Sequence, residues 1–93
     1  MTATRYASVW DALEDGPGAV EDLKIRSALV QDLAARITSS GSTPGEAAEQ
    51  FGVTQVRISD LLAGRIDTFS IDTLVTMLAT AGLHLDLHVR EAS

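Results

Sequence analysis

Few side chains in this sequence combine in a way that could catalyse a reaction. Cysteine is absent, which excludes disulfides, thiolate ligands for zinc and thiol nucleophiles. His84, Asp86 and His88 are metal-ligand types, but alternate residues of a strand lie about 6.6 Å apart, too far for one ion. No serine–histidine–aspartate triad or carboxylate pair can be recognised. We therefore expect neither an enzyme nor a metal or cofactor site.

A polar helix face suited to the edges of DNA bases is the stronger candidate. Thr54 can cap a short helix that ends before Gly64, with Ile58, Leu61 and Leu62 predicted to face inward. The opposite face then carries Gln55, Val56, Arg57, Ser59 and Asp60. Glutamine can bond adenine at two points, arginine can bond guanine, and an apolar side chain can contact a thymine methyl. The alternative is an ordinary solvated helix face.

A second short helix precedes this one and would position it. Thr43 is a typical N-cap, Pro44 suits the first helical position, and Glu46 completes a capping box. That helix is predicted to end one or two residues before Gly52, where a left-handed backbone is accessible. Val53 is expected to fill the corner between the helices. Two short helices joined by a tight turn form the arrangement that places its second helix in the major groove.

Further elements are predicted on both sides of this pair. Apolar residues recur every four positions over residues 20–39, beginning with Ile25, which predicts a long amphipathic helix. Another helix is predicted between Ser70 and Gly82. A short N-terminal helix capped by Ser8 is expected to stop at the breaker cluster of residues 15–18.

Residues 83–90 alternate between apolar and polar side chains, which predicts a strand. One strand cannot satisfy its own backbone groups, so we expect it to pair with the same strand of a second copy. The apolar face of this dimer interface would be Leu83, Leu85, Leu87 and Val89. A two-fold homodimer would also place two recognition helices about 34 Å apart, as a palindromic operator requires.

The 93 residues allow one domain, and an apolar content of 45% suits a globular chain. We predict a mainly α fold, a four- to five-helix bundle with one C-terminal strand. It divides into an N-terminal segment at 1–19, a DNA-binding domain at 20–82 and a dimerisation strand at 83–93. No secretory signal or transmembrane run is visible, so a cytoplasmic location is expected.

The net charge of −6 argues against nucleic-acid binding through bulk charge. Residues 1–22 carry one cation and five anions, a net −4. Residues 23–93 carry six cations and eight anions, a net −2. Much of the acidity thus lies before the predicted DNA-binding helices, and any DNA affinity must come from local geometry and a few well-placed cations.

The central motifs resemble the Cro/C1-type (XRE) helix-turn-helix family over roughly residues 23–80. They are TPGEAA at 43–48, GVTQ at 52–55, ISDL at 58–61 and the glycine at 64. Together with SVWDAL at 8–13 and FSIDTL at 69–74, the longer pattern is similar to HigA-type antitoxins of bacterial toxin–antitoxin pairs.

The resemblance implies roles for individual residues on the DNA side. Combined with the polar face described above, it predicts DNA contacts by Thr43, Thr54, Gln55, Val56, Arg57, Ser59, Asp60 and Arg65. The sequence departs from the family at Pro44, where a glutamine is common, which puts one phosphate contact in doubt. It also departs at Asp60, an anion at a base-facing position, which could instead form an i,i+3 ion pair with Arg57.

The resemblance also implies a transcriptional autorepressor that neutralises a HigB-like ribonuclease toxin. The acidic N-terminal segment suits a basic partner, with Val9, Trp10 and Leu13 as its apolar anchor, although these residues could equally pack on the protein's own core. The alternatives are a phage- or plasmid-type repressor without a toxin, and a protein-interaction module that has lost DNA binding. The net negative charge and Asp60 favour the last of these.

Overall fold

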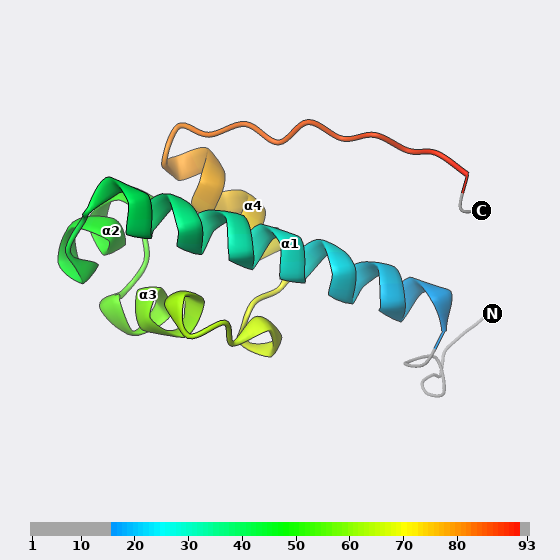
Figure 1. Ribbon diagram of the computed structural model, residues 1–93, viewed down its shortest axis with the longest axis horizontal. Helices are drawn as coiled ribbons and strands as arrows, with labels where there is room; N and C mark the ends of the chain where they lie inside the picture. Colours follow the sequence, from blue (N-terminus) through cyan, green and yellow to red (C-terminus); the bar gives the residue numbers. More distant parts are fainter. Residues whose placement is uncertain (1–15, 92–93) are drawn as a thin grey trace.

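The computed structural model describes residues 16–91, and this part of the chain is mainly α-helical. Its elements are α1 (Pro17–Ser40), α2 (Pro44–Phe51), α3 (Gln55–Leu62), the 3-10 helix η1 (Ile66–Thr68) and α4 (Ile71–Thr80). Figure 1 shows α1 running the length of the molecule, with α3 on one side of it and residues 83–91 on the other. The mainly α prediction is therefore confirmed, with four α-helices in the described residues. None of these helices is long and apolar enough to cross a membrane.

The long helix α1 begins at Pro17, inside the cluster predicted to break the chain. Proline is well tolerated at a first helical position, because the N–H that it lacks would have no partner within the helix. The breaker cluster therefore starts α1 three residues earlier than predicted. Gly41, with φ 71°, ends the helix. The short helix predicted to begin at Ser8 lies outside the described residues.

The other three helices begin as predicted, because each N-cap hydroxyl accepts a backbone N–H that the helix leaves unpaired. Thr43 Oγ1 accepts a hydrogen bond from Glu46 N at 3.1 Å, and Glu46 Oε1 accepts one from Thr43 N at 2.9 Å. This capping box starts α2. Ser70 Oγ accepts from Thr73 N at 3.1 Å and starts α4.

One apolar core holds the helices together. α1 packs against α3 and α4, and α2 packs against α3 and α4. The core contains thirteen buried residues, which are Leu29, Val30, Leu33, Ile37, Ala47, Ala48, Phe51, Ile58, Leu61, Phe69, Leu74, Met77 and Leu78. Burial of a large aliphatic or aromatic side chain contributes about 1.5–3 kcal/mol. The core therefore fixes where α3 can lie.

Two residues predicted to face the core are exposed. Ile25 begins the apolar stripe of α1 but is 40% exposed, because the first turns of α1 extend past the helices that cover the rest of it (Figure 1). Leu62 follows the buried Leu61 on α3 and is 43% exposed. The inward face of a helix as short as α3 has room for Ile58 and Leu61 only.

The strand predicted at the C-terminus is absent from the described residues. Residues 83–91 have no assigned secondary structure. Leu83 and Leu85 pack against the core, whereas Leu87 and Val89 are 76% and 98% exposed. A strand is defined by hydrogen bonds to a neighbouring strand, and residues 16–91 of one copy supply no such neighbour. The strand prediction is thus wrong for the single chain, and the division of the chain into three parts stays a prediction.

Candidate nucleic-acid interface

The turn between α2 and α3 is closed by backbone hydrogen bonds. Gly52 has φ 71°, its N–H donates to Glu49 O at 3.3 Å, and Val53 N donates to Ala48 O at 3.0 Å. This pair of bonds is the Schellman motif, in which a left-handed residue ends the helix. A Cβ at Gly52 would also lie 3.1 Å from Thr80 Cγ2 of α4. Glycine is therefore suited to this corner both by its backbone conformation and by the close approach of α4.

The recognition-helix candidate α3 begins at its cap and is anchored from one side. Thr54 Oγ1 accepts from Arg57 N at 3.2 Å. Ile58 and Leu61 are fully buried, so the side opposite them is directed outward. Val56 lies on that side and is 70% exposed, and Ser59 is exposed as well. An exposed valine has no packing role in the chain and is available to a thymine methyl.

Gln55 lies across the first turn of α2. A Cβ built on Gly45 would be 3.3 Å from Gln55 Nε2. The amide of Gln55 thus adjoins the beginning of α2, where Thr43 is exposed. The start of α3, at Thr54 and Gln55, therefore lies beside the start of α2, whose N-cap is Thr43.

Arg57 was predicted to face outward, but its guanidinium contacts Thr68 and Phe69. Its Nη1 donates to Thr68 O at 2.7 Å, and its Cζ lies 5.3 Å from the centroid of the Phe69 ring. The guanidinium is therefore bound to the segment that leads from η1 to α4. The alternative considered for Asp60, an ion pair with Arg57, is not found among the described residues, where Asp60 Oδ1 lies 3.7 Å from Arg65 Nε instead.

The charges around this surface nearly cancel. Residues 43–65 contain two arginines and three carboxylates. One carboxylate belongs to Glu46, which is engaged in the capping box, and another to Asp60, which has Arg65 beside it. The anion at a predicted base-facing position is thus partly compensated by a neighbouring cation, which lessens its repulsion of phosphates.

Sequence reasoning missed the involvement of the link between η1 and α4. Thr68 and Phe69 hold Arg57 from 11 and 12 residues further along the chain, a separation with no periodic signal. The scarcity of aromatic residues could have drawn attention to Phe69, which is buried. The predicted partner-binding residues Val9, Trp10 and Leu13 lie outside the described residues.

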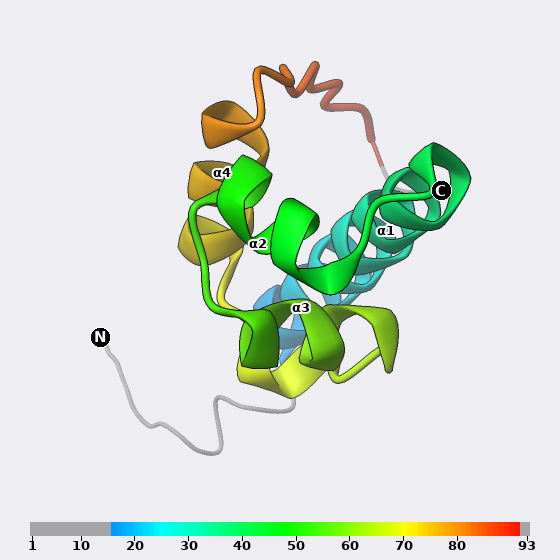
Figure 2. The same ribbon diagram turned by 90° about the vertical axis from the view of Figure 1, so that its left-hand side faces the viewer.

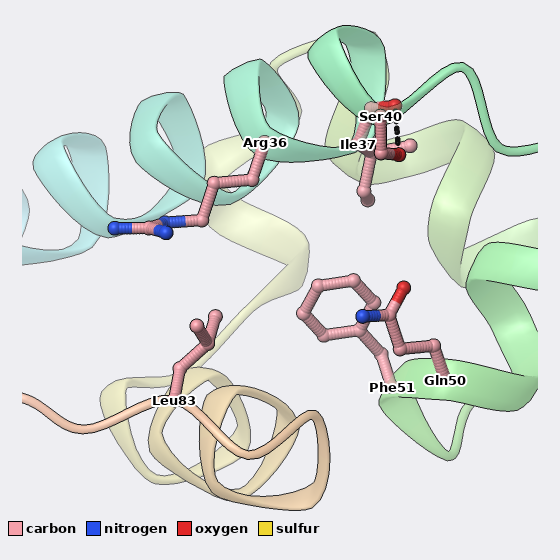
Figure 3. Close-up of a pocket in the computed structure, with 6 residues that line it drawn as sticks. All are labelled: Arg36, Ile37, Ser40, Gln50, Phe51 and Leu83. Atoms are coloured by element: carbon pink, nitrogen blue, oxygen red, sulfur yellow. Dashed lines mark hydrogen bonds between the residues drawn. The ribbon is translucent and has the colours of Figure 1, made fainter.

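One pocket away from this surface is smaller than a typical ligand site. Figure 3 shows it, a space of about 140 Å³ where Phe51 faces α1 and Leu83. It is lined by Arg36, Ile37, Ser40, Gln50, Phe51 and Leu83. Small-molecule sites commonly measure about 300–1,000 Å³. His84 Nε2 lies 3.5 Å from Asp86 Oδ1, but residues 16–91 contain no cluster of three or more groups that could hold a metal ion.

Comparison with known families agrees with this geometry. Residues 12–90 match the model of a family described as a helix-turn-helix domain. The match covers both α2–α3 and the helices that support them, and it confirms the resemblance at the level of a helix-turn-helix DNA-binding domain. No curated protein matches the chain. The chain belongs to the helix-turn-helix domain family.

Proposed function

We propose that this protein is a sequence-specific regulator that binds double-stranded DNA with α3 in the major groove. The observation that carries the proposal is the exposed outward side of α3 beside the beginning of α2. Val56 is 70% exposed there, and Gln55 lies next to Gly45. In this docking geometry the N-terminal residues of the second helix contact base edges, while the first helix crosses the backbone.

The proposed contacts divide into those that position the protein and those that confer specificity. Gln55 would bond adenine, while Val56 and Ser59 complete the base-contacting surface. Thr43 and Thr54 are the N-caps of α2 and α3, where phosphates commonly bind, and the exposed Arg65 precedes η1 and would contact a phosphate by its charge. Arg57 would need to leave Thr68 and Phe69 before it could contact DNA.

A fluorescence-anisotropy titration with the DNA upstream of the gene tests this proposal. Gln55→Ala should weaken specific binding by about 1–3 kcal/mol and leave binding to unrelated DNA nearly unchanged. Arg65→Ala should weaken binding to both DNAs and reduce the slope of log K against log salt by about 1. The matched control is Gln31→Ala, an exposed glutamine of α1. Equal effects of the two glutamine variants, or no binding of wild type, would contradict the proposal.

The HigA-type resemblance supports a more specific role, that of an autorepressing antitoxin. We propose that the segment before α1, with Val9, Trp10 and Leu13, binds a basic ribonuclease toxin. Co-expression with a small basic protein encoded beside this gene tests the role. Rescue of growth by wild type and its loss in Trp10→Ala support it. Absence of such a neighbour favours a repressor without a toxin.

The repressor is proposed to act as a two-fold homodimer on a palindromic operator. Support comes from residues 83–91, which have no strand partner among the described residues and whose Leu87 and Val89 are exposed. A protein-interaction module without DNA binding is the competing candidate. The near-neutral charge of residues 43–65 favours it, and the titration above separates the two.

A further inference from the structure

A groove runs between the first turns of α1 and the C-terminal segment. It measures about 810 Å³ and is lined by Glu21, Lys24, Ile25, Leu87, His88, Val89 and Arg90. Figure 1 shows residues 83–91 running back along α1 toward its N-terminal end. Val20 and Leu23, on the same turns of α1, are about half exposed. Apolar side chains are thus exposed along this end of α1 and on the C-terminal segment opposite it.

The C-terminal segment changes its environment halfway along. Leu83 N donates to Leu78 O at 2.8 Å, and Leu83 and Leu85 pack on the core. Leu87 and Val89 continue the same alternation but are 76% and 98% exposed beside the groove. Exposed aliphatic side chains beside an unpaired extended backbone fit an occupant that is itself an extended chain.

We propose that this groove is filled by the C-terminal segment of a second copy, with residues 86–90 of the two copies paired antiparallel about His88. This inference deepens the homodimer of the proposed function by assigning its register and its contact surface. In this register Leu87 faces the partner's Val89 on the side of the helices. On the outer side Asp86 faces the partner's Arg90, and the two-fold axis repeats each pair.

The positions of the charged side chains favour this register over pairing about residue 86 or residue 87. Among the described residues, no carboxylate lies within 4.0 Å of a nitrogen of Arg90, although four other lysine or arginine side chains have one. Pairing about His88 gives Arg90 a carboxylate from the partner. Pairing about residue 86 would place Asp86 opposite the partner's Asp86, and like charges directly opposite each other destabilise a sheet. Pairing about residue 87 would place Arg90 opposite the partner's His84, which supplies no carboxylate.

Sedimentation equilibrium of the full chain, without DNA, tests the pairing separately from DNA binding. Wild type should have twice the mass of one chain at micromolar concentration. Leu87→Asp should be monomeric with unchanged helix content, because Leu87 is 76% exposed in one copy. The matched control is Leu62→Asp, because Leu62 is also exposed and belongs to α3, which lies on the other side of α1 from residues 83–91 (Figures 1 and 2). This variant should remain dimeric.

A charge exchange then tests the register. Asp86→Arg and Arg90→Asp should each raise the dimer dissociation constant by about 10-fold, because each converts two attractive cross-strand pairs into repulsive ones. The double variant Asp86→Arg/Arg90→Asp should return to within about 3-fold of wild type. A monomeric wild type, a dimeric Leu87→Asp variant, or a double variant weaker than both single variants overturns the proposal.

Discussion

Arg57 is the residue whose removal tests most directly how α3 is held in place. Alanine at this position removes the bond from Nη1 to Thr68 O, 2.7 Å long, and the contact of the guanidinium with Phe69. A hydrogen bond from a charged group contributes about 1.5–3 kcal/mol, and a cation–π contact at an exposed site about 0.5–1 kcal/mol. Thr68 is exposed, so water can replace the lost donor. We therefore expect Arg57→Ala to reduce the free energy of unfolding by about 1–2 kcal/mol.

Thermal unfolding followed by circular dichroism measures this loss. In a domain of this size 1 kcal/mol corresponds to about 4–8 °C, so the Tm of Arg57→Ala should fall by about 4–16 °C. The matched control is Arg36→Ala on α1, which removes an exposed i,i+4 ion pair with Asp32. Such a pair contributes about 0.3–0.5 kcal/mol, so the control should lose at most about 4 °C.

A double-mutant cycle assigns the loss to its cause. Phe69→Leu keeps an apolar residue in the core but removes the aromatic face, and Arg57 and Phe69 should show a coupling energy of about 0.5–1 kcal/mol. Arg57→Lys keeps the charge but not the planar guanidinium, so its Tm should lie between those of wild type and Arg57→Ala. The reasoning is refuted if Arg57→Ala and Arg36→Ala unfold at the same temperature, or if the coupling energy is zero.

The remaining predictions concern the corner and core that position α3, and all are measured as changes in unfolding free energy by urea denaturation. Gly52→Ala should destabilise by about 1–2 kcal/mol, because alanine is strained at φ 71°. It should do so more than Gly41→Ala, which has the same φ but no neighbour within 4 Å of the added Cβ. The excess should disappear in a Thr80→Ser background, which lacks the Cγ2 that the new Cβ would meet; an undiminished excess would contradict this. Thr43→Ala removes the capping box and should lower the free energy of unfolding by about 1 kcal/mol. An unchanged free energy would show that the capping box does not stabilise the protein. Ile58→Ala should lower the free energy of unfolding by about 2–5 kcal/mol, because the isoleucine side chain is fully buried. A decrease below about 1 kcal/mol would contradict the role of Ile58 as an anchor of α3.

Local signals predicted the helix-turn-helix because its bonds are short-range. The capping box joins Thr43 to a residue three positions later, and the Schellman bonds at Gly52 join residues three and five positions apart. Each motif needs only particular side chains, or a glycine, at fixed spacings. For the same reason the buried anchors Ile58 and Leu61 could be selected by helical periodicity.

The sequence-based predictions were wrong where the burial or secondary structure of a residue depends on its neighbours in space. Helical periodicity predicts which face of α1 is apolar, but not how far the other helices cover that face. Ile25 lies on the apolar face and is nevertheless 40% exposed. The alternation of residues 83–90 predicts a strand, yet a strand requires a partner that one chain lacks. Leu62 was predicted to face inward with Ile58 and Leu61, but it is 43% exposed.

The starts of α2, α3 and α4 and the tight corner at Gly52 could be predicted from the sequence, because each depends on groups a few residues apart. The partners of Arg57 and Asp60 became known only from the folded chain, since those partners come from residues after α3. The tertiary structure also decided which apolar residues of α1 and of the C-terminal segment stay exposed. Burial is a property of neighbouring elements in space, and a linear pattern specifies the face of an element without specifying what covers it.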